Sequence, residues 1–498
     1  MIFELNEQTK VTQNEGSSAS KPVLNARLLR KIFAKCPDVH FSVFTFQNQH
    51  VTLIYCSGLV NQETLFKTIP KALESFFSSH NDEHNKETII NGLNLPNLGY
   101  IEQKEKAESE IFAGKLLIDF GLPGTIIYVD IADRPKRNPE DANTEANIQG
   151  ARDNFIEELY VNISLIRKRL RTASFVYEVL EIGRRTKTKV AILYLEDIAN
   201  KDILKKIKDK LDQIDIDGLF SGTQLEELIN DRPYALFPRH RYTGKPDFAV
   251  TSVLNGRFII LIDGVTTAYI TPVNFSFILK VAEDQEVSYI VSSLQRIMRV
   301  GGLFISTFLP GFWVAITTIH QDQLPINLLA TVVESRRGVP LPTSFEAFIM
   351  LIIFGLFNEA GLRLPKSIGQ ILSVVGGLII GEAAISAGLT SPAMLVIISL
   401  STVATFTLQN TSLIGTLFFA RFFVLLCSSL LGFFGLLFSF FLLCGYIGNI
   451  QIFGVPYLEM ANDLSAGNFL KTFFRVPEQK WKKRPSSVQV NDQSKKGN

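Results

Sequence analysis

The chain has 498 residues, 46% of them hydrophobic, and a formal net charge of +2 from 50 Lys and Arg against 48 Asp and Glu. This near-neutral balance resembles that of an ordinary globular protein, and its four cysteines, Cys36, Cys56, Cys427 and Cys444, are too few and too scattered for a disulfide framework. The averages hide two unlike parts, because residues 1–297 are rich in charges and residues 300–450 are nearly free of them. We therefore expect a soluble region followed by a membrane domain.

Residues 1–23 are polar and are predicted to be disordered. They contain no apolar stretch of the kind found in a secretory signal peptide, so the soluble region is expected to stay in the cytosol.

The soluble region is predicted to be α+β, with two subdomains over residues 24–171 and 172–297. Expected elements, in chain order, are a helix at 27–36, a hairpin of strands 39–46 and 51–57, a helix at 67–77, strands 113–120 and 125–131, helices at 151–171 and 175–184, a strand at 188–197 and a helix at 201–214. The scattered lysines of residues 201–210 indicate a solvated helix face and not a nucleic-acid patch. Thr223 and Glu226 have the spacing of a capping box for the next helix. Asn255-Gly256 between two apolar runs predicts a second hairpin, and residues 265–271 predict a third strand.

The amphipathic helix within residues 151–171 ends in a basic cluster. Its apolar positions recur in steps of three and four: Ile156, Leu159, Ile163, Ile166 and Leu170. Its basic residues are Arg167, Lys168, Arg169 and Arg171. We expect these cations to be solvated and to complement the helix dipole, although a role at a membrane surface remains open.

Residues 298–450 predict a bundle of about four to six membrane helices. The apolar segments are 300–319, 345–362, 368–388, 392–408 and 413–447. As one helix the last segment would be about 50 Å long, which favours two short spans that turn near Gly432–Gly435 over a single tilted helix. Arg296 and Arg299 precede the first span, as the positive-inside rule requires for a cytoplasmic N-terminal region. The tail, residues 451–498, is basic and predicted to be mostly disordered.

No motif of an enzyme, nucleotide or cofactor site is recognised in the sequence, so a non-enzymatic protein is expected. His80 and His84 have the spacing of two metal ligands, but no third ligand is near in the sequence, and a surface pair is the preferred interpretation.

The candidate functional residues lie in the membrane, where polar groups are costly. On a helix over 366–388, one narrow face carries polar and small residues, among them Lys366, Gln370, Ser373, Gly377 and Gly381. Two interpretations remain open, and both can hold together. The face packs closely against another helix through Gly377-x-x-x-Gly381, or it lines a water-filled path.

Four further charged residues accompany this predicted pore. Glu382 lies about 6 Å from the centre of the span and needs water or a partner. A Glu382–Arg421 pair is one guess, with no spacing argument behind it. Glu359 and Arg363 are four residues apart and can pair with each other.

Several motifs coincide in order with those of a known family. They are Gly150-Ala151-Arg152-Asp153-Asn154-Phe155, then IDG (262–264), ESRRGVPLP (334–342), NEAGLRLPKSIGQ (358–370), VVGGLIIGEAA (374–384) and SPAM (391–394). From about residue 25 to 460, the chain resembles the A subunits of GerA-type spore germination receptors. Where the family usually has Arg-Gly-Pro-Arg-Glu-Gly-Phe, residues 149–155 read Gln-Gly-Ala-Arg-Asp-Asn-Phe, so roles of the missing Arg and Pro do not carry over. Gly150, Arg152 and Phe155 are the positions that match.

The resemblance implies a multi-pass subunit in the inner membrane of a spore, acting with a transporter-like B subunit and a lipoprotein C subunit. It also implies a homo-oligomer, expected to be a pentamer, that forms a nutrient-gated channel for monovalent cations. Two alternatives stay open: a non-conducting signalling scaffold and a secondary transporter, the latter weakened because no inverted repeat is visible.

Overall fold

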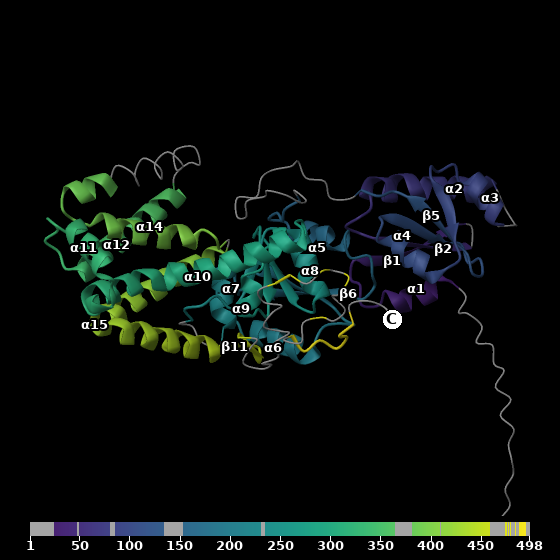
Figure 1. The fold of residues 1–498 in the computed structure, drawn as a ribbon. Helices are drawn as coiled ribbons and strands as arrows, with labels where there is room; N and C mark the ends of the chain where they lie inside the picture. Colours follow the sequence, from purple (N-terminus) through teal and green to yellow (C-terminus); the bar gives the residue numbers. More distant parts are fainter. Residues whose placement is uncertain are drawn as a thin grey trace, which may run out of the picture. The chain divides into compact units, whose positions relative to one another are not determined.

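The computed structural model describes residues 24–46, 49–79, 85–133, 153–230, 235–363, 381–408 and 410–458, together with 474–475, 477, 479, 484 and 488–494 (Figure 1). The contacts divide the chain into two compact units, Met1–Arg134 with Arg171–Ala173, and Pro135–Leu170 with Ser174–Asn498. The predicted disorder of residues 1–23 lies outside the described residues.

The first unit is built on an antiparallel sheet with the strand order β1-β2-β4-β5-β3. Its elements are α1 (Ala26–Ile32), β1 (Val39–Phe46), β2 (Gln49–Cys56), η1 (Thr64–Thr68), α2 (Ile69–Ser79), α3 (Lys86–Gly92), β3 (Leu98–Ile101), α4 (Lys104–Ile111), β4 (Lys115–Asp119) and β5 (Ile126–Asp130). One apolar cluster joins the sheet to α2 and α3, and a second joins it to α1 and α4. Helices therefore cover both faces, and the predicted β1–β2 hairpin and β4–β5 pair are confirmed.

The second unit begins with a sheet of the same kind, in the order β6-β7-β9-β10-β8. Its elements are α5 (Leu159–Arg167), β6 (Phe175–Ile182), β7 (Thr188–Leu195), α6 (Lys201–Asp212), α7 (Gly222–Ile229), β8 (Arg241–Thr243), α8 (Pro246–Leu254), β9 (Phe258–Ile262) and β10 (Ala268–Thr271). Helices α6 and α7 pack on one face, and α5 and α8 on the other. Both sheets therefore have the same connectivity, with β1 to β5 corresponding to β6 to β10, and the soluble region is a structural repeat.

The segment 175–184, predicted to be a helix, is strand β6, so that prediction is wrong. The strand pairs with β7 along its whole length, from Phe175 opposite Leu195 to Ile182 opposite Thr188. Its sequence, FVYEVLEI, is rich in aromatic and β-branched residues, which fit the pleated and half-buried surface of a sheet.

The hairpin predicted at Asn255-Gly256 is also wrong. Pro246 opens helix α8 at its first turn, and Asn255 caps the C-terminus of this helix. Gly256, with φ of +82°, takes the left-handed conformation that commonly ends a helix. The same dipeptide therefore serves as a helix stop here instead of a hairpin turn.

The capping box predicted for α7 does not form. The N-cap is Ser221, whose hydroxyl accepts a hydrogen bond from the Gln224 backbone N at 3.2 Å. The Glu226 carboxylate instead accepts from the Arg239 backbone N at 3.2 Å. Burial raises the pKa of this carboxyl.

The basic end of α5 is solvated only in part: Arg171 is exposed as expected, but Arg167 is not. Arg167 is fully buried, with its guanidinium 4.4 Å from the centre of the Phe175 ring. Arg169 pairs with Asp153 at 3.0 Å and with Asp247. Arg167 therefore belongs to the interior of the second subdomain, and Arg169 forms ion pairs at its partly exposed edge.

The rest of the described chain is mainly helical. Its elements are α9 (Phe275–Ile278), η2 (Ala282–Gln285), α10 (Tyr289–Thr318), η3 (Gln321–Gln323), α11 (Ile326–Ser335), α12 (Thr343–Arg363), α14 (Pro392–Thr405) and α15 (Thr411–Gly448), followed by the short strands β11 (Gln451–Ile452) and β12 (Val455–Pro456). Three of the described helices, Tyr289–Thr318, Thr343–Ala360 and Ser412–Gly448, are long and apolar enough to cross a membrane. An α+β region followed by a helical membrane region confirms the predicted fold class.

Helix α15 is a hairpin of two arms. Gly432 interrupts it with non-helical angles, φ of +60° and ψ of −135°. Both ends of α15 reach the loop before β8, because Thr416 donates its hydroxyl to the Leu236 carbonyl at 2.6 Å and the Tyr446 hydroxyl accepts from the Leu236 N–H at 3.0 Å. The predicted turn near Gly432–Gly435 is confirmed.

Parts of the predicted disordered tail belong to the folded core. Ile450, Ile452, Val455 and Tyr457 are buried with β10 and α6 in one apolar cluster. Val488 and Val490 are buried in the cluster between the second sheet and α5 and α8. The prediction of a mostly disordered tail is therefore wrong for residues 451–457 and 488–494.

Candidate functional site

Most of the predicted pore face, on the helix over residues 366–388, lies outside the described residues, including Lys366, Gln370, Ser373 and Gly377. Residues 381–386 are helical, with Gly381 buried and Glu382 exposed. A Cβ on Gly381 would lie 3.1 Å from the Leu395 side chain of α14, so this helix packs closely against α14 on the glycine side.

Glu359 and Arg363 both fall in α12, and Glu359 is exposed. The side chain of Arg363 lies outside the described part of the chain, so their pairing stays a prediction. Of the motif residues, Gly150 and Arg152 also lie outside it. Phe155 is buried between α5, α8 and the sheet, and its backbone N donates to the Gly244 carbonyl at 2.9 Å, so it acts as a core residue.

A polar centre lies inside the helical bundle at Arg421, a residue that the sequence analysis named only as a guessed partner of Glu382. This arginine is 5% exposed. Its Nε donates to the Ser306 carbonyl of α10 at 2.6 Å, and its Nη2 donates to the Thr405 hydroxyl at 2.5 Å and the Ser401 carbonyl of α14 at 3.3 Å. Among the described residues no carboxylate lies within ion-pair distance, so the guessed pair with Glu382 is wrong.

Pro310 explains why the Ser306 carbonyl is available. In an uninterrupted helix this oxygen would accept from the N–H of residue 310, but proline has none. Arg421 and the Ser401 hydroxyl, at 2.9 Å, both donate to this oxygen instead. A freed backbone group in lipid must find such a partner, so the proline and the arginine form one structural unit.

Small residues on α10 let the three helices approach at this centre. A Cβ at Gly302 would collide with Thr407, and one at Gly311 would lie 2.8 Å from the Ser428 hydroxyl of α15. With Ser306 between them, these residues form a small-residue face, the usual means of close packing between membrane helices.

A small pocket adjoins Arg421. Its volume is ≈ 30 Å³, and its lining comes from α12, α14 and α15: Leu351, Phe354, Gly355, Asn358, Thr402, Thr405, Phe406, Ile414, Phe418 and Arg421.

A second buried polar contact fixes the start of α14. The carboxylate of Glu346, on α12 and fully buried, accepts from the backbone N of Ser391 at 2.5 Å and from its hydroxyl at 2.6 Å. The Thr390 hydroxyl donates to the same oxygen at 3.0 Å. A carboxylate at a helix N-terminus complements the helix dipole, so Glu346 holds α12 and α14 together.

The junction between the second subdomain and α10 is an ion cluster around Asp284. This carboxylate, 2% exposed, accepts from Arg296 at 3.0 Å and from Arg299, while Arg475 of the C-terminal part donates to the Asp284 carbonyl at 2.5 Å. Burial on its own would raise the pKa of Asp284, but the hydrogen bond and charge of Arg299 outweigh it and hold the pKa below its usual range. The two arginines that the sequence placed before the first span therefore anchor α10 to the soluble region.

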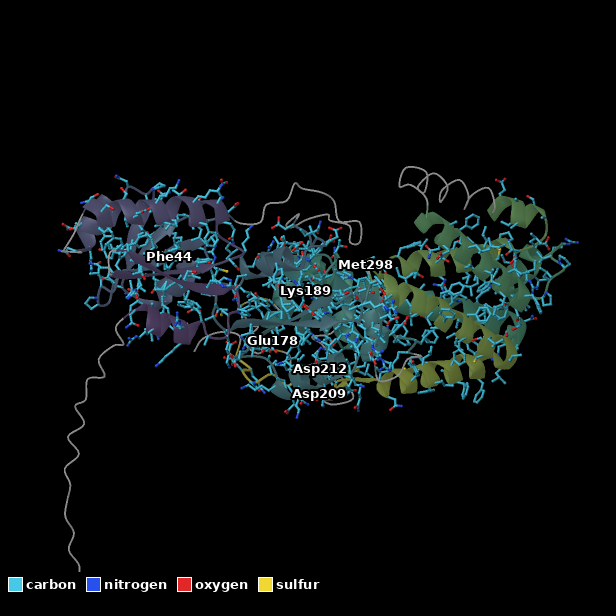
Figure 2. The ribbon with its side chains drawn as sticks, turned by 180° about the vertical axis from the view of Figure 1, so that it is seen from behind. Phe44, Glu178, Lys189, Asp209, Asp212 and Met298 are labelled. Carbon is cyan, nitrogen blue, oxygen red and sulfur yellow. The ribbon has the colours of Figure 1, made fainter. Side chains whose placement is uncertain are left out.

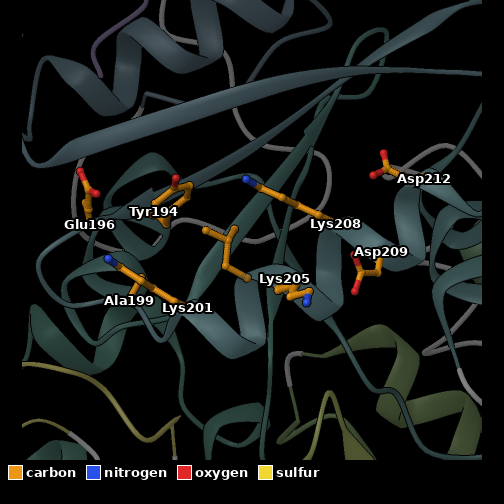
Figure 3. A pocket seen from close by; sticks show the side chains of 9 residues that line it. Tyr194, Glu196, Ala199, Lys201, Lys205, Lys208, Asp209 and Asp212 are labelled. Atoms are coloured by element: carbon orange, nitrogen blue, oxygen red, sulfur yellow. The ribbon is translucent and has the colours of Figure 1, made fainter. Parts of the chain in front are cut away.

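The soluble region carries one larger pocket among its described residues, of ≈ 340 Å³, between the end of β7 and α6 (Figure 3). Lysines and acidic residues both line it, and Glu178, labelled in Figure 2, pairs with Lys208 at 2.5 Å and accepts from Tyr194 at 2.7 Å. Lysines and acidic residues stand side by side in this lining, so its charge does not favour one class of ligand.

Comparison with known proteins places the chain in a family. The description "GerA: Bacillus/Clostridium GerA spore germination protein" matches residues 27–487. Spore germination protein XA of Bacillus anthracis is 42% identical over 95% of this chain and 97% of its own length. The uncharacterized membrane protein YfkQ of Bacillus subtilis (strain 168) is 32% identical over 91% of this chain and 88% of its own.

One solved structure is similar in part. The N-terminal domain of the A subunit of the Bacillus megaterium spore germinant receptor GerK3 is 24% identical, with a TM-score of 0.38, and the similarity covers 50% of this chain and 93% of that one. On the family match and the full-length relatives together, this chain is a membrane-associated member of the GerA family of spore germination proteins.

Proposed function

We propose that this chain is the A-type subunit of a nutrient germinant receptor, and that several copies of it form a nutrient-gated channel for monovalent cations. It acts in the inner membrane of the spore, with its N-terminal region in the cytoplasm, beside a transporter-like B subunit and a lipoprotein C subunit, and it catalyses no reaction. The helix over residues 366–388 lines the path.

The packing of the described helices supports a path between copies. Helices α10, α12, α14 and α15 enclose an apolar core: Val314, Ala347, Met350, Leu351, Met394, Ile398 and Leu425. Because this apolar core fills the space between the described helices, we place the conducting route on the outer face of the bundle, between copies.

The observation that carries the proposal is the exposed carboxylate of Glu382. Gly381, beside it, is turned toward Leu395 of α14, so Glu382 faces away from the protomer's own bundle. An ionised side chain facing lipid is costly, and such residues usually face water or another protein surface. A water-filled path shared by several copies satisfies Glu382, and its negative charge favours cations at that point.

The test is potassium flux from liposomes containing the full-length chain, alone and with the two partner subunits, with and without a nutrient mixture. We expect Glu382→Gln to lower the flux about tenfold, the effect of ~1.4 kcal/mol on the barrier for ion entry. Glu334→Gln is the matched control, because Glu334 pairs with Arg337 on the exposed surface of α11.

Side-chain size provides the second part of the test. Substituting Ser373 and Gly377 by larger residues should reduce flux in proportion to their size if both line the path. If the wild type and all variants assemble with the partner subunits but none conducts potassium, the result would instead support the scaffold function. Flux that is insensitive to positions 373, 377 and 382 would move the path elsewhere in the bundle.

A further inference from the structure

Arg421 places a full positive charge deep in the bundle. It lies ten residues after the start of α15, which corresponds to about 15 Å along an arm of about 30 Å that ends at Gly432. The charge therefore lies within the arm of α15 that is expected to cross the membrane, where an isolated ion is costly.

The partners of Arg421 among the described residues are all neutral. They are two backbone carbonyls and one hydroxyl. Two of them belong to the last turn of α14, whose dipole provides only about half a negative charge. The undescribed segment 364–380 contains no Asp or Glu, so it cannot provide the missing carboxylate.

Arg421 is one of the residues that line the small pocket, and its guanidinium has N–H donors left over. Nη1 has no acceptor within hydrogen-bond distance among the described residues, although a guanidinium offers five N–H donors. Asn358, Thr402 and Thr405 contribute further polar groups to the pocket, and Phe354 and Phe418 contribute apolar walls. A water molecule needs about 10–15 Å³ of such space, so ≈ 30 Å³ admits a small ion but not an amino acid or a nucleotide.

We propose that this pocket is an anion site, in which Arg421 and the Asn358 amide hold one chloride ion between α12, α14 and α15. The ion supplies the negative charge that the described residues do not place there, and it joins the three helices. This site is separate from the proposed cation path, which runs along the outer face of the bundle at Glu382.

The test is thermal unfolding of the purified full-length protein in detergent, with increasing sodium chloride replacing sodium gluconate at constant ionic strength. Gluconate is too large for the pocket. We expect the Tm to rise by several degrees and to saturate with chloride, because a ligand that binds only the folded state stabilises it by mass action. Equal Tm values in the two salts would overturn the proposal.

Variants locate the effect. Arg421→Gln should remove the chloride dependence, whereas Arg337→Gln, at an exposed arginine that follows α11, should retain it. If Arg421→Gln does not fold, Asn358→Leu keeps the arginine and fills the pocket, and it should lose the chloride response as well. A chloride response of wild-type size in Asn358→Leu, or in a folded Arg421→Gln, would place the ion elsewhere and refute the site.

Discussion

His240 is a buried imidazole whose two ring nitrogens find no hydrogen-bond partner among the described residues. Burial is the main cause that lowers its pKa to about 3, and the charge of the neighbouring Arg239 lowers it further. The side chain is therefore neutral in the folded protein at every physiological pH, and it packs against Phe453 of the β11–β12 turn as an aromatic core residue.

This depressed pKa predicts an acid-dependent loss of stability. Below pH ~6.5 the unfolded chain binds a proton at His240 that the folded chain excludes until about pH 3, so stability falls as the pH falls through that range. Through His240, the free energy of unfolding falls by up to ~1.4 kcal/mol for each pH unit. Between pH 6.5 and 5, the free energy of unfolding should fall by ~2 kcal/mol less in His240→Phe than in the wild type. Thermal unfolding of the full chain at each pH measures this difference.

His50→Gln provides the control for this prediction. His50 is exposed on β2, so its loss should leave the pH profile of the wild type unchanged. Parallel profiles for His240→Phe and the wild type would contradict the assignment of acid sensitivity to His240.

At the scale of the element, the turn of α15 depends on one glycine. Gly432 adopts φ of +60° and ψ of −135°, a region of backbone space that side chains make costly. A Cβ there would also lie 2.5 Å from the His320 ring, at the end of the first membrane helix. The hairpin needs this glycine for both reasons.

Gly432→Ala is therefore expected to destabilise the bundle by ~1–3 kcal/mol through backbone strain, with a further cost from displacing His320. Gly415→Ala is the matched control, because Gly415 lies in the helical first arm with no neighbour within 4 Å of an added Cβ. Its expected effect is neutral or slightly stabilising. Thermal unfolding in detergent measures both, and equal Tm values for the two variants would contradict the strained turn.

Two elements show where local patterns mislead. Residues 175–184 were predicted to be a helix, and the pairing with β7 shows that they form a strand. Asn255-Gly256 was predicted to be a hairpin turn, but Asn-Gly can also end a helix, and here it follows α8, which Pro246 opens at its first turn. In both cases the deciding information lies outside the short segment.

At the scale of the whole molecule, the C-terminal residues 488–494 close the second subdomain. The backbone N of Asn491 donates to the Ile198 carbonyl at 3.0 Å, and Asn200 donates to the Gln489 carbonyl at 2.9 Å. Val490 covers Gly256, where any Cβ would collide with it. Because the family match ends at residue 487, these contacts lie beyond the part of the chain that the family description covers.

Removing residues 488–498 should therefore destabilise the second subdomain. Val488 and Val490 are nearly fully buried, and burying one such side chain contributes ~1.5–3 kcal/mol. We expect the truncated chain to lose ~3 kcal/mol or more and to be cut faster by protease, whereas removal of residues 495–498 alone should change neither. Unchanged protease resistance after the longer truncation would show that residues 488–494 contribute nothing to the core.

The sequence by itself determined the two-part architecture, the membrane helices, the turn of the last apolar segment and the family. These features depend on composition and on long apolar runs, which local patterns report directly. The tertiary structure alone decided that Arg167 is buried, that Asp284 gathers Arg296 and Arg299, and that Arg421 satisfies the carbonyl that Pro310 leaves free. Such contacts join residues far apart in the chain, and whether a charge is solvated or buried depends on which helices and strands meet around it.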